Sequence, residues 1–159
     1  MSNLLNTGEK IRIAGTINDS IVDGPGLRFT VFTQGCDNNC PGCHNPHTHD
    51  KNGGELIEID EILKTIDKNP LLDGVTISGG EPFLQAEQLV PLAKMIKERD
   101  LSLMVYTGYI YENLIAEEKY SGLLQYVDIL VDGPYIESQK SLDSGFTGSK
   151  NQRVIELTK

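Results

Sequence analysis

Short apolar runs rich in β-branched residues alternate along the chain with longer segments in which apolar residues recur every three or four positions. Runs of the first kind are typical of strands, and segments of the second kind are typical of amphipathic helices. Strands are predicted at 27–35, 74–78, 101–106 and 126–133, with weaker candidates at 12–18, expected at a sheet edge, and at 153–157. Helices are predicted at 59–68, from the GGEP turn to about residue 99, and at about 110–118.

Two of the predicted helices have features that bear on their packing and shape. The segment IDEILKTIDK has its apolar residues on one helical face, the pattern of a helix packed on a core; these are Ile59, Ile62, Leu63 and Ile66. Pro91 lies inside the next helical segment and removes one backbone hydrogen bond there. A kink or a restart of the helix is therefore expected near Pro91.

Strands that alternate with helices indicate βα units and an α/β fold with a mainly parallel sheet. The chain has too few such units to close an eight-stranded barrel, and we expect one domain over residues 1–159. Ligands of such sheets bind beyond the carboxyl ends of the strands. Those ends carry four unusual loops, with the sequences GCDNNCPGCH, SGGEP, YTGY and VDGPY.

Composition narrows the classes of function. The net charge of −9 argues against nucleic-acid binding, because phosphate contacts need clustered Lys and Arg. The sequence has no apolar run long enough to span a bilayer, and its first residues lack the basic start and apolar core of a signal peptide. We therefore expect a cytoplasmic protein without a membrane partner, in which thiols stay reduced.

All three cysteines and all three histidines lie within residues 35–50. The thiols of Cys36, Cys40 and Cys43 have the spacing C-x3-C-x2-C, which indicates a metal centre more than a disulfide. One interpretation is structural zinc, with a histidine as the fourth ligand, chosen from His44, His47 and His49. The other is a 4Fe–4S cluster with three thiolate ligands and one iron left open for a substrate. A structural zinc mostly stabilises small folds without a core, and this chain has the apolar residues for a core.

The cysteine motif together with SGGEP after a later strand resembles the radical S-adenosylmethionine (SAM) enzymes. The finer resemblance is to the glycyl-radical-enzyme activases, in the branch that serves anaerobic ribonucleoside-triphosphate reductase. It covers the chain from about residue 12 to its end. The strings that carry it are DGPGLRFTVFTQGC (23–36), CPGCHNP (40–46), SGGEPFLQ (78–85), YTGY (106–109), DILVDGPY (128–135) and GSKNQRVI (148–155).

The resemblance implies a partial TIM-type barrel of the radical SAM kind, with helices outside. It implies that Cys36, Cys40 and Cys43 bind the 4Fe–4S cluster and that SAM chelates the open iron. Reductive cleavage of SAM then gives a 5′-deoxyadenosyl radical, which installs a glycyl radical on anaerobic ribonucleoside-triphosphate reductase. A flavodoxin- or ferredoxin-type protein is the expected electron donor. The alternatives are an activase for another glycyl radical enzyme, such as pyruvate formate-lyase, and a non-catalytic zinc-binding module.

The resemblance also implies a SAM site, whose candidate residues are Gly42, His44, Gly79, Gly80, Glu81, Thr107 and Asp132. Glycines in the GGEP turn allow the backbone to approach a ligand closely. The plain alternative is a tight turn in which Glu81 begins a helix, and for Asp132 it is ordinary turn chemistry. Arg153 is interpreted either as a partner of a carboxylate of SAM or of the partner protein, or as a salt-bridged strand residue. His47 and His49 are expected in a solvated loop without a role.

Overall fold

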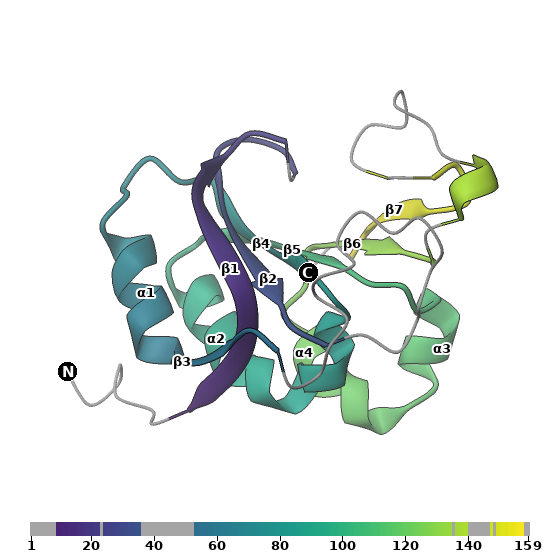
Figure 1. Cartoon of the computed structure of the whole chain (residues 1–159), viewed down its shortest axis with the longest axis horizontal. Helices are drawn as coiled ribbons and strands as arrows, with labels where there is room; N and C mark the ends of the chain where they lie inside the picture. Colours follow the sequence, from purple (N-terminus) through teal and green to yellow (C-terminus); the bar gives the residue numbers. More distant parts are fainter. Residues whose placement is uncertain are drawn as a thin grey trace.

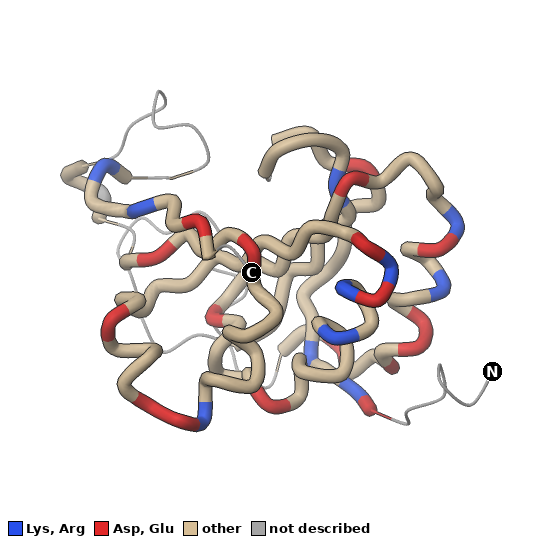
Figure 2. The backbone as a smooth tube through the Cα atoms, turned by 180° about the vertical axis from the view of Figure 1, so that it is seen from behind, with Lys and Arg blue, Asp and Glu red and all other residues tan. Residues whose placement is uncertain are grey.

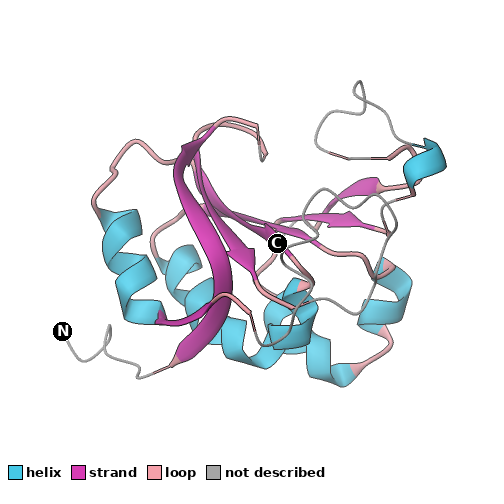
Figure 3. Ribbon diagram, viewed as in Figure 1, coloured by secondary structure: helices cyan, strands magenta, loops and turns pink. Residues whose placement is uncertain are grey.

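The computed structural model describes residues 9–22, 24–35, 53–134, 136–139, 147 and 149–157. These residues form an α/β fold around a seven-stranded sheet of order β3-β1-β2-β4-β5-β6-β7. Helices α1, α2, α3 and α4 all lie on the same face of this sheet (Figure 1, Figure 3). In the described part of the chain, no helix is both long enough and apolar enough to cross a bilayer.

The centre of the sheet is parallel and its margins are antiparallel. The strands are β1 (Lys10–Ser20), β2 (Arg28–Thr33), β3 (Glu55–Glu58), β4 (Gly74–Gly79), β5 (Ser102–Tyr106), β6 (Ile129–Asp132) and β7 (Arg153–Glu156). Strands β2, β4, β5 and β6 pair in parallel, whereas β1 pairs antiparallel with both β2 and β3, and β7 pairs antiparallel with β6. The predicted parallel centre is confirmed, but the sheet as a whole is mixed rather than mainly parallel.

The helical layer contains α1 (Ile59–Asp67), η3 (Pro82–Gln85), α2 (Ala86–Glu98), α3 (Tyr111–Ile115), η4 (Glu118–Tyr120) and α4 (Ser121–Leu124), and η5 (Glu137–Gln139) follows β6. Alternate strand residues face this layer, since side chains in a strand point to opposite faces in turn. Buried residues such as Val31, Ile77 and Val105 pack there against Leu63 of α1 and Leu92 of α2. This apolar layer holds the helices against the sheet, and the loops that follow the strands lie at the ends of the sheet, outside this layer.

Three details differ from the sequence-based expectation. Strand β1 is eleven residues long and lies inside the sheet, while the edge position belongs to the unpredicted β3. Helix α2 runs from Ala86 to Glu98 without a restart at Pro91. A proline inside a helix costs about 3 kcal/mol, and burial of Leu89, Leu92 and Ile96 offsets this cost. The change of helix type occurs earlier, between η3 and α2.

The amino ends of the parallel strands are closed by a buried arginine. The guanidinium of Arg28, only 1% exposed, donates to Thr76 Oγ1 at 2.8 Å and to the carbonyl oxygens of Pro25, Val75 and Ser102 at 2.9, 3.0 and 3.0 Å. Burial lowers the pKa of this group below its ordinary value. Gly24 lies against Arg28, and a Cβ there would stand 2.7 Å from the Arg28 Cδ atom. This end of the sheet is thus filled by the protein itself.

Candidate functional site

The four loops singled out in the sequence follow neighbouring parallel strands. Thr33 at the end of β2 pairs with Gly79 at the end of β4, and Tyr106 at the end of β5 pairs with Val131 of β6. Carboxyl ends of parallel strands meet at one edge of a sheet. The structure therefore brings the SGGEP, YTGY and VDGP loops to the edge of the sheet that also holds Gly35, the last described residue before the cysteines.

The SGGEP loop is fastened to the end of β2 through its backbone. The Gly80 amide donates to Thr33 O at 2.9 Å, and the Glu81 amide donates to Gly35 O at 2.7 Å. Gly79 has a φ of 103°, and a Cβ on it would stand 2.5 Å from Thr33 N. Only glycine permits both this conformation and this approach. The residue directly before Cys36 is thereby held against the SGGEP loop.

The Glu81 side chain is 0% exposed and joins two loops. Its Oε2 atom accepts hydrogen bonds from Phe83 N at 3.1 Å and from Thr107 Oγ1 at 2.7 Å, and its Oε1 atom accepts one from Gly108 N at 2.7 Å. The bond to Phe83 caps η3, as the interpretation of Glu81 at a helix start predicted. The two bonds to Thr107 and Gly108 were not foreseen, and they tie the loop after β4 to the loop after β5.

Thr107 continues this series toward β6. Its amide donates to Val131 O at 2.8 Å, and its Oγ1 atom accepts from Tyr109 N at 3.0 Å while it donates to Glu81. The residue is 5% exposed. The Thr107 hydroxyl therefore holds the YTGY loop in place, since it bonds both Glu81 and the Tyr109 amide.

Asp132, at the end of β6, is 1% exposed and bonds Arg153 through both carboxylate oxygens. Arg153 Nε donates to Oδ1 at 3.0 Å and Nη2 donates to Oδ2 at 2.5 Å, while Tyr111 N donates to Oδ2 at 2.8 Å. Arg153 also donates to both carboxylate oxygens of Glu112, at 2.8 and 3.3 Å. These bonds raise the pKa of Arg153 and lower that of Glu112. The interpretation of Arg153 as a salt-bridged strand residue is confirmed.

The side chains of the GSKNQRVI string fasten the C-terminal strand to the loop after β6. Asn151 Nδ2 donates to Pro134 O at 2.9 Å, and Gln152 Nε2 donates to Gly133 O at 2.9 Å. Ser149 Oγ accepts from Ile136 N at 3.2 Å. The sequence marked this string only by resemblance, and the structure gives it a packing role around VDGP.

The three cysteines, together with Gly42 and His44 of the candidate SAM site, fall outside the described residues, as do His47 and His49. Within the described ranges, no group of three potential metal ligands occurs. Lys and Arg are interspersed with Asp and Glu along the described backbone (Figure 2).

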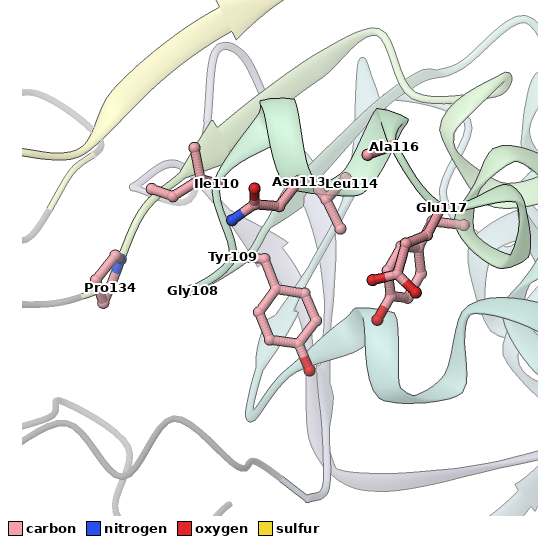
Figure 4. A pocket seen from close by; sticks show the side chains of 9 residues that line it. Gly108, Tyr109, Ile110, Asn113, Leu114, Ala116, Glu117 and Pro134 are labelled. Carbon is pink, nitrogen blue, oxygen red and sulfur yellow. The ribbon is translucent and has the colours of Figure 1, made fainter.

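A pocket of about 520 Å³ opens beside the YTGY loop, lined among others by Tyr109, Asn113 and Glu117, with Pro134 across from them (Figure 4). The Tyr120 ring lines it and packs edge-on against Phe83, with centroids 5.6 Å apart. This pocket was not predicted from the sequence; its lining comes from residues 108–120, which include α3 and η4, and from Pro134 after β6.

Comparison with known proteins identifies the class. Residues 22–155 match the family of the 4Fe-4S single cluster domain. The chain also resembles the solved structure of QueE from Escherichia coli, with a TM-score of 0.52 and 20% identity over 68% of this chain and 57% of that one. At this identity the likeness concerns the fold. The chain is thus a member of the 4Fe-4S single cluster domain family.

Curated relatives narrow the family further. The anaerobic ribonucleoside-triphosphate reductase-activating protein of Haemophilus influenzae is 32% identical over 144 residues, covering 84% of this chain and 90% of that protein. The protein of that name from enterobacteria phage T4 is 31% identical over 86% of this chain and 88% of its own length. The pyruvate formate-lyase-activating enzyme of Clostridium pasteurianum is 38% identical, over 76% of this chain but 50% of that enzyme. The chain belongs to the family of anaerobic ribonucleoside-triphosphate reductase-activating proteins.

Proposed function

We propose that this chain is a radical SAM activase that installs a glycyl radical on anaerobic ribonucleoside-triphosphate reductase. When bound, a 4Fe–4S cluster and SAM supply a 5′-deoxyadenosyl radical, which takes one hydrogen atom from a backbone glycine of the reductase. The electron comes from a flavodoxin- or ferredoxin-type donor. Family membership and the activating-protein relatives support this assignment. The observation that carries it is the bond of 2.7 Å from the Glu81 amide to Gly35 O, because it sets the SGGEP loop beside the start of the cysteine segment.

The residues present fit such a cofactor set. Three thiolates, those of Cys36, Cys40 and Cys43, suit an iron–sulfur cluster, and Cys36 follows the anchored Gly35 directly. The absence of a Cβ on Gly79 serves its close approach to Thr33, and we assign the exposed side of the Gly79 and Gly80 backbone to contact with the amino and carboxylate groups of SAM. We assign the remaining SAM site to Gly42, His44, Glu81, Thr107 and Asp132. Since Glu81, Thr107 and Asp132 already bond neighbouring loops, they contribute by setting the shape of the site.

The proposed architecture is a partial TIM-type barrel within a single domain. Four central parallel strands with the helices on one face support it (Figure 1). We further propose a cytoplasmic location, where thiols remain reduced, and neither a nucleic acid nor a membrane as partner. A net charge of −9 fits a protein partner with a basic docking face better than a polyanion.

One anaerobic experiment tests the enzyme assignment. The chain is reconstituted with iron and sulfide, reduced and mixed with SAM, and 5′-deoxyadenosine and the EPR signal of the cluster are measured. Cys40→Ala is expected to lose the cluster, whereas a variant with His44, His47 and His49 all replaced is expected to keep it. Stoichiometric zinc without iron uptake, or loss of metal in the histidine variant, would favour the zinc module instead.

The second candidate is activation of pyruvate formate-lyase, which the identity of 38% to the Clostridium pasteurianum enzyme favours. The chain spans half of that enzyme, whereas it covers 90% of the Haemophilus influenzae protein. Presenting the loaded chain separately to each target and recording the glycyl radical by EPR distinguishes the two. A radical on the formate-lyase alone would reverse the assignment.

A further inference from the structure

The described residues on either side of the cysteine-bearing segment 36–52 bond one point on β1. On the entry side, the Gln34 amide donates to Arg12 O at 3.0 Å. On the exit side, Arg12 Nη1 donates to Gly53 O at 3.0 Å. Gly54 follows with a φ of 65°, so close to β1 that a Cβ on it would stand 2.2 Å from Ile13 O. A single residue of β1 thus bonds the chain on both sides of the cysteines.

The Gln85 side chain binds the backbone of Arg12. Its Oε1 atom accepts from Arg12 N at 2.8 Å, and its Nε2 atom donates to Arg12 O at 2.8 Å and to Gln34 O at 3.3 Å. The amide therefore pairs with the backbone of residue 12 as a strand neighbour would. Gln85 lies 73 positions from Arg12 in sequence and ends the 3-10 helix that follows the SGGEP loop.

These contacts lie where the ladder between β1 and β2 is irregular. The register shifts between Ile13 and Gly15, opposite Thr33 and Phe32. An irregular ladder leaves backbone groups without their regular partners, and the Gln85 amide occupies the donor and acceptor of Arg12 just beyond this shift. The same 3-10 helix begins at the Glu81 cap, whose amide holds Gly35.

We propose that Gln85 and Arg12 are positioning residues for the cluster, forming a clamp that fixes both ends of the cysteine segment relative to the SGGEP loop. The inference rests on the proposed function for the identity of the cluster. Fixing both ends removes chain freedom that three thiolate ligands would otherwise have to remove on binding. Loosening either end is therefore expected to weaken cluster retention before it unfolds the chain.

The test uses the full chain, reconstituted anaerobically with iron and sulfide, and the variants Gln85→Met and Arg12→Met, which keep side-chain bulk. The rate at which a chelator removes iron is measured, together with the reduction potential and EPR line shape of the cluster. Each variant is expected to lose iron about tenfold faster, as the loss of one to three hydrogen bonds predicts, and to shift the spectrum. In the cluster-free chain, Gln85→Met is expected to speed hydrogen exchange of the Arg12 amide.

Two controls separate positioning from general loss of stability. Gln125→Met removes an exposed side-chain amide that donates to Gly122 O at 3.2 Å, and is expected to change neither stability nor iron release. Arg99→Met breaks the ion pair to Asp67, remote from the segment, and should lower the melting temperature without faster iron release. Iron release within about twofold of the wild type in both clamp variants, or equal acceleration in Arg99→Met, would overturn the proposal.

The outcome is separable from that of the proposed function. A chain that holds a cluster but does not cleave SAM refutes the activase assignment, while the iron-release rates still decide on the clamp. A chain that takes up no iron refutes both.

Discussion

The buried carboxylate of Glu81 can be tested by replacing it with its amide. In Glu81→Gln, one oxygen that accepts hydrogen bonds becomes an NH2 group that cannot accept any. The better of the two orientations keeps the oxygen toward Phe83 N and Thr107 Oγ1 and turns the NH2 group toward Gly108 N. Two donors then face each other across the space that the 2.7 Å bond occupied.

The cost follows from hydrogen-bond energetics. Removing one partner of a buried hydrogen bond leaves the other group unsatisfied, which costs about 1–3 kcal/mol and more where a charged group is involved. We expect Glu81→Gln to lower the free energy of unfolding by about 2–3 kcal/mol, which corresponds to roughly 6–9 °C in melting temperature for a chain of this size. Thr107→Val removes one of the three donors that bond the Glu81 side chain within the described residues, and is expected to cost about 1–2 kcal/mol.

The assay is urea and thermal unfolding of the cluster-free chain without SAM. A side chain whose only role is to contact SAM would leave stability unchanged under these conditions, so the experiment separates the two roles of Glu81. In the double variant, the loss should be smaller than the sum of the single losses by about 1 kcal/mol, because the two residues share a bond. A Glu81→Gln chain within about 0.5 kcal/mol of the wild type would refute the reasoning.

Three further changes probe the rest of the fold. Gly79→Ala should cost about 2–4 kcal/mol in urea unfolding, because its φ of 103° and the 2.5 Å approach to Thr33 N exclude a Cβ; Gly15→Ala, with nothing within 4 Å, is the matched control and should change little. Pro91→Ala should raise the free energy of unfolding by about 1–2 kcal/mol in thermal unfolding, since it restores a helical hydrogen bond. A lower stability of this variant would mean that packing of the proline ring stabilises the fold. The Arg99 hydrogen bonds hold the pKa of Asp67 below 3.8, so the small stabilisation by this pair is present above pH 3.8 and is lost as the pH falls through the folded pKa. The melting temperature of Asp67→Asn should therefore lie below that of the wild type near neutrality, and the difference should disappear in acid. A difference that stays constant with pH would contradict this reasoning.

The sequence predicted those parts of the fold that depend on local pattern. The apolar face of 59–68, the β-branched run at 74–78 and the apolar run at 101–106 correspond to α1, β4 and β5. Strand β3 was missed because ELIE shows only two adjacent apolar residues, and its pairing with β1 is a tertiary contact. The mixed character of the sheet was missed for the same reason, since strand direction depends on how the chain returns.

In the candidate site, too, local features could be predicted from the sequence and long-range contacts could not. Glycines in SGGEP and a carboxylate at a helix start are local features, and the sequence indicated both. The partners of Glu81 lie 26 and 27 positions away, and those of Asp132 lie 21 positions away in both directions along the chain. Such pairs require the sheet register, which one sequence does not contain. Gln85 is the clearest example. The motif SGGEPFLQ that contains it was recognised by resemblance, but its bond to Arg12, 73 positions away, could not be predicted.

The contacts at the carboxyl edge form a series rather than separate pairs. Gly35 is joined to Glu81, Glu81 to Thr107 and Gly108, and Thr107 to β6 through Val131. Gly133 N then donates to Tyr109 O at 2.9 Å, which closes the link between the loops after β5 and β6. Because each loop bonds the next, a change at Glu81 or Thr107 should alter the geometry presented by the whole edge. These polar side chains therefore hold the loops in position, and direct contact of the SGGEP backbone with SAM remains part of the proposal.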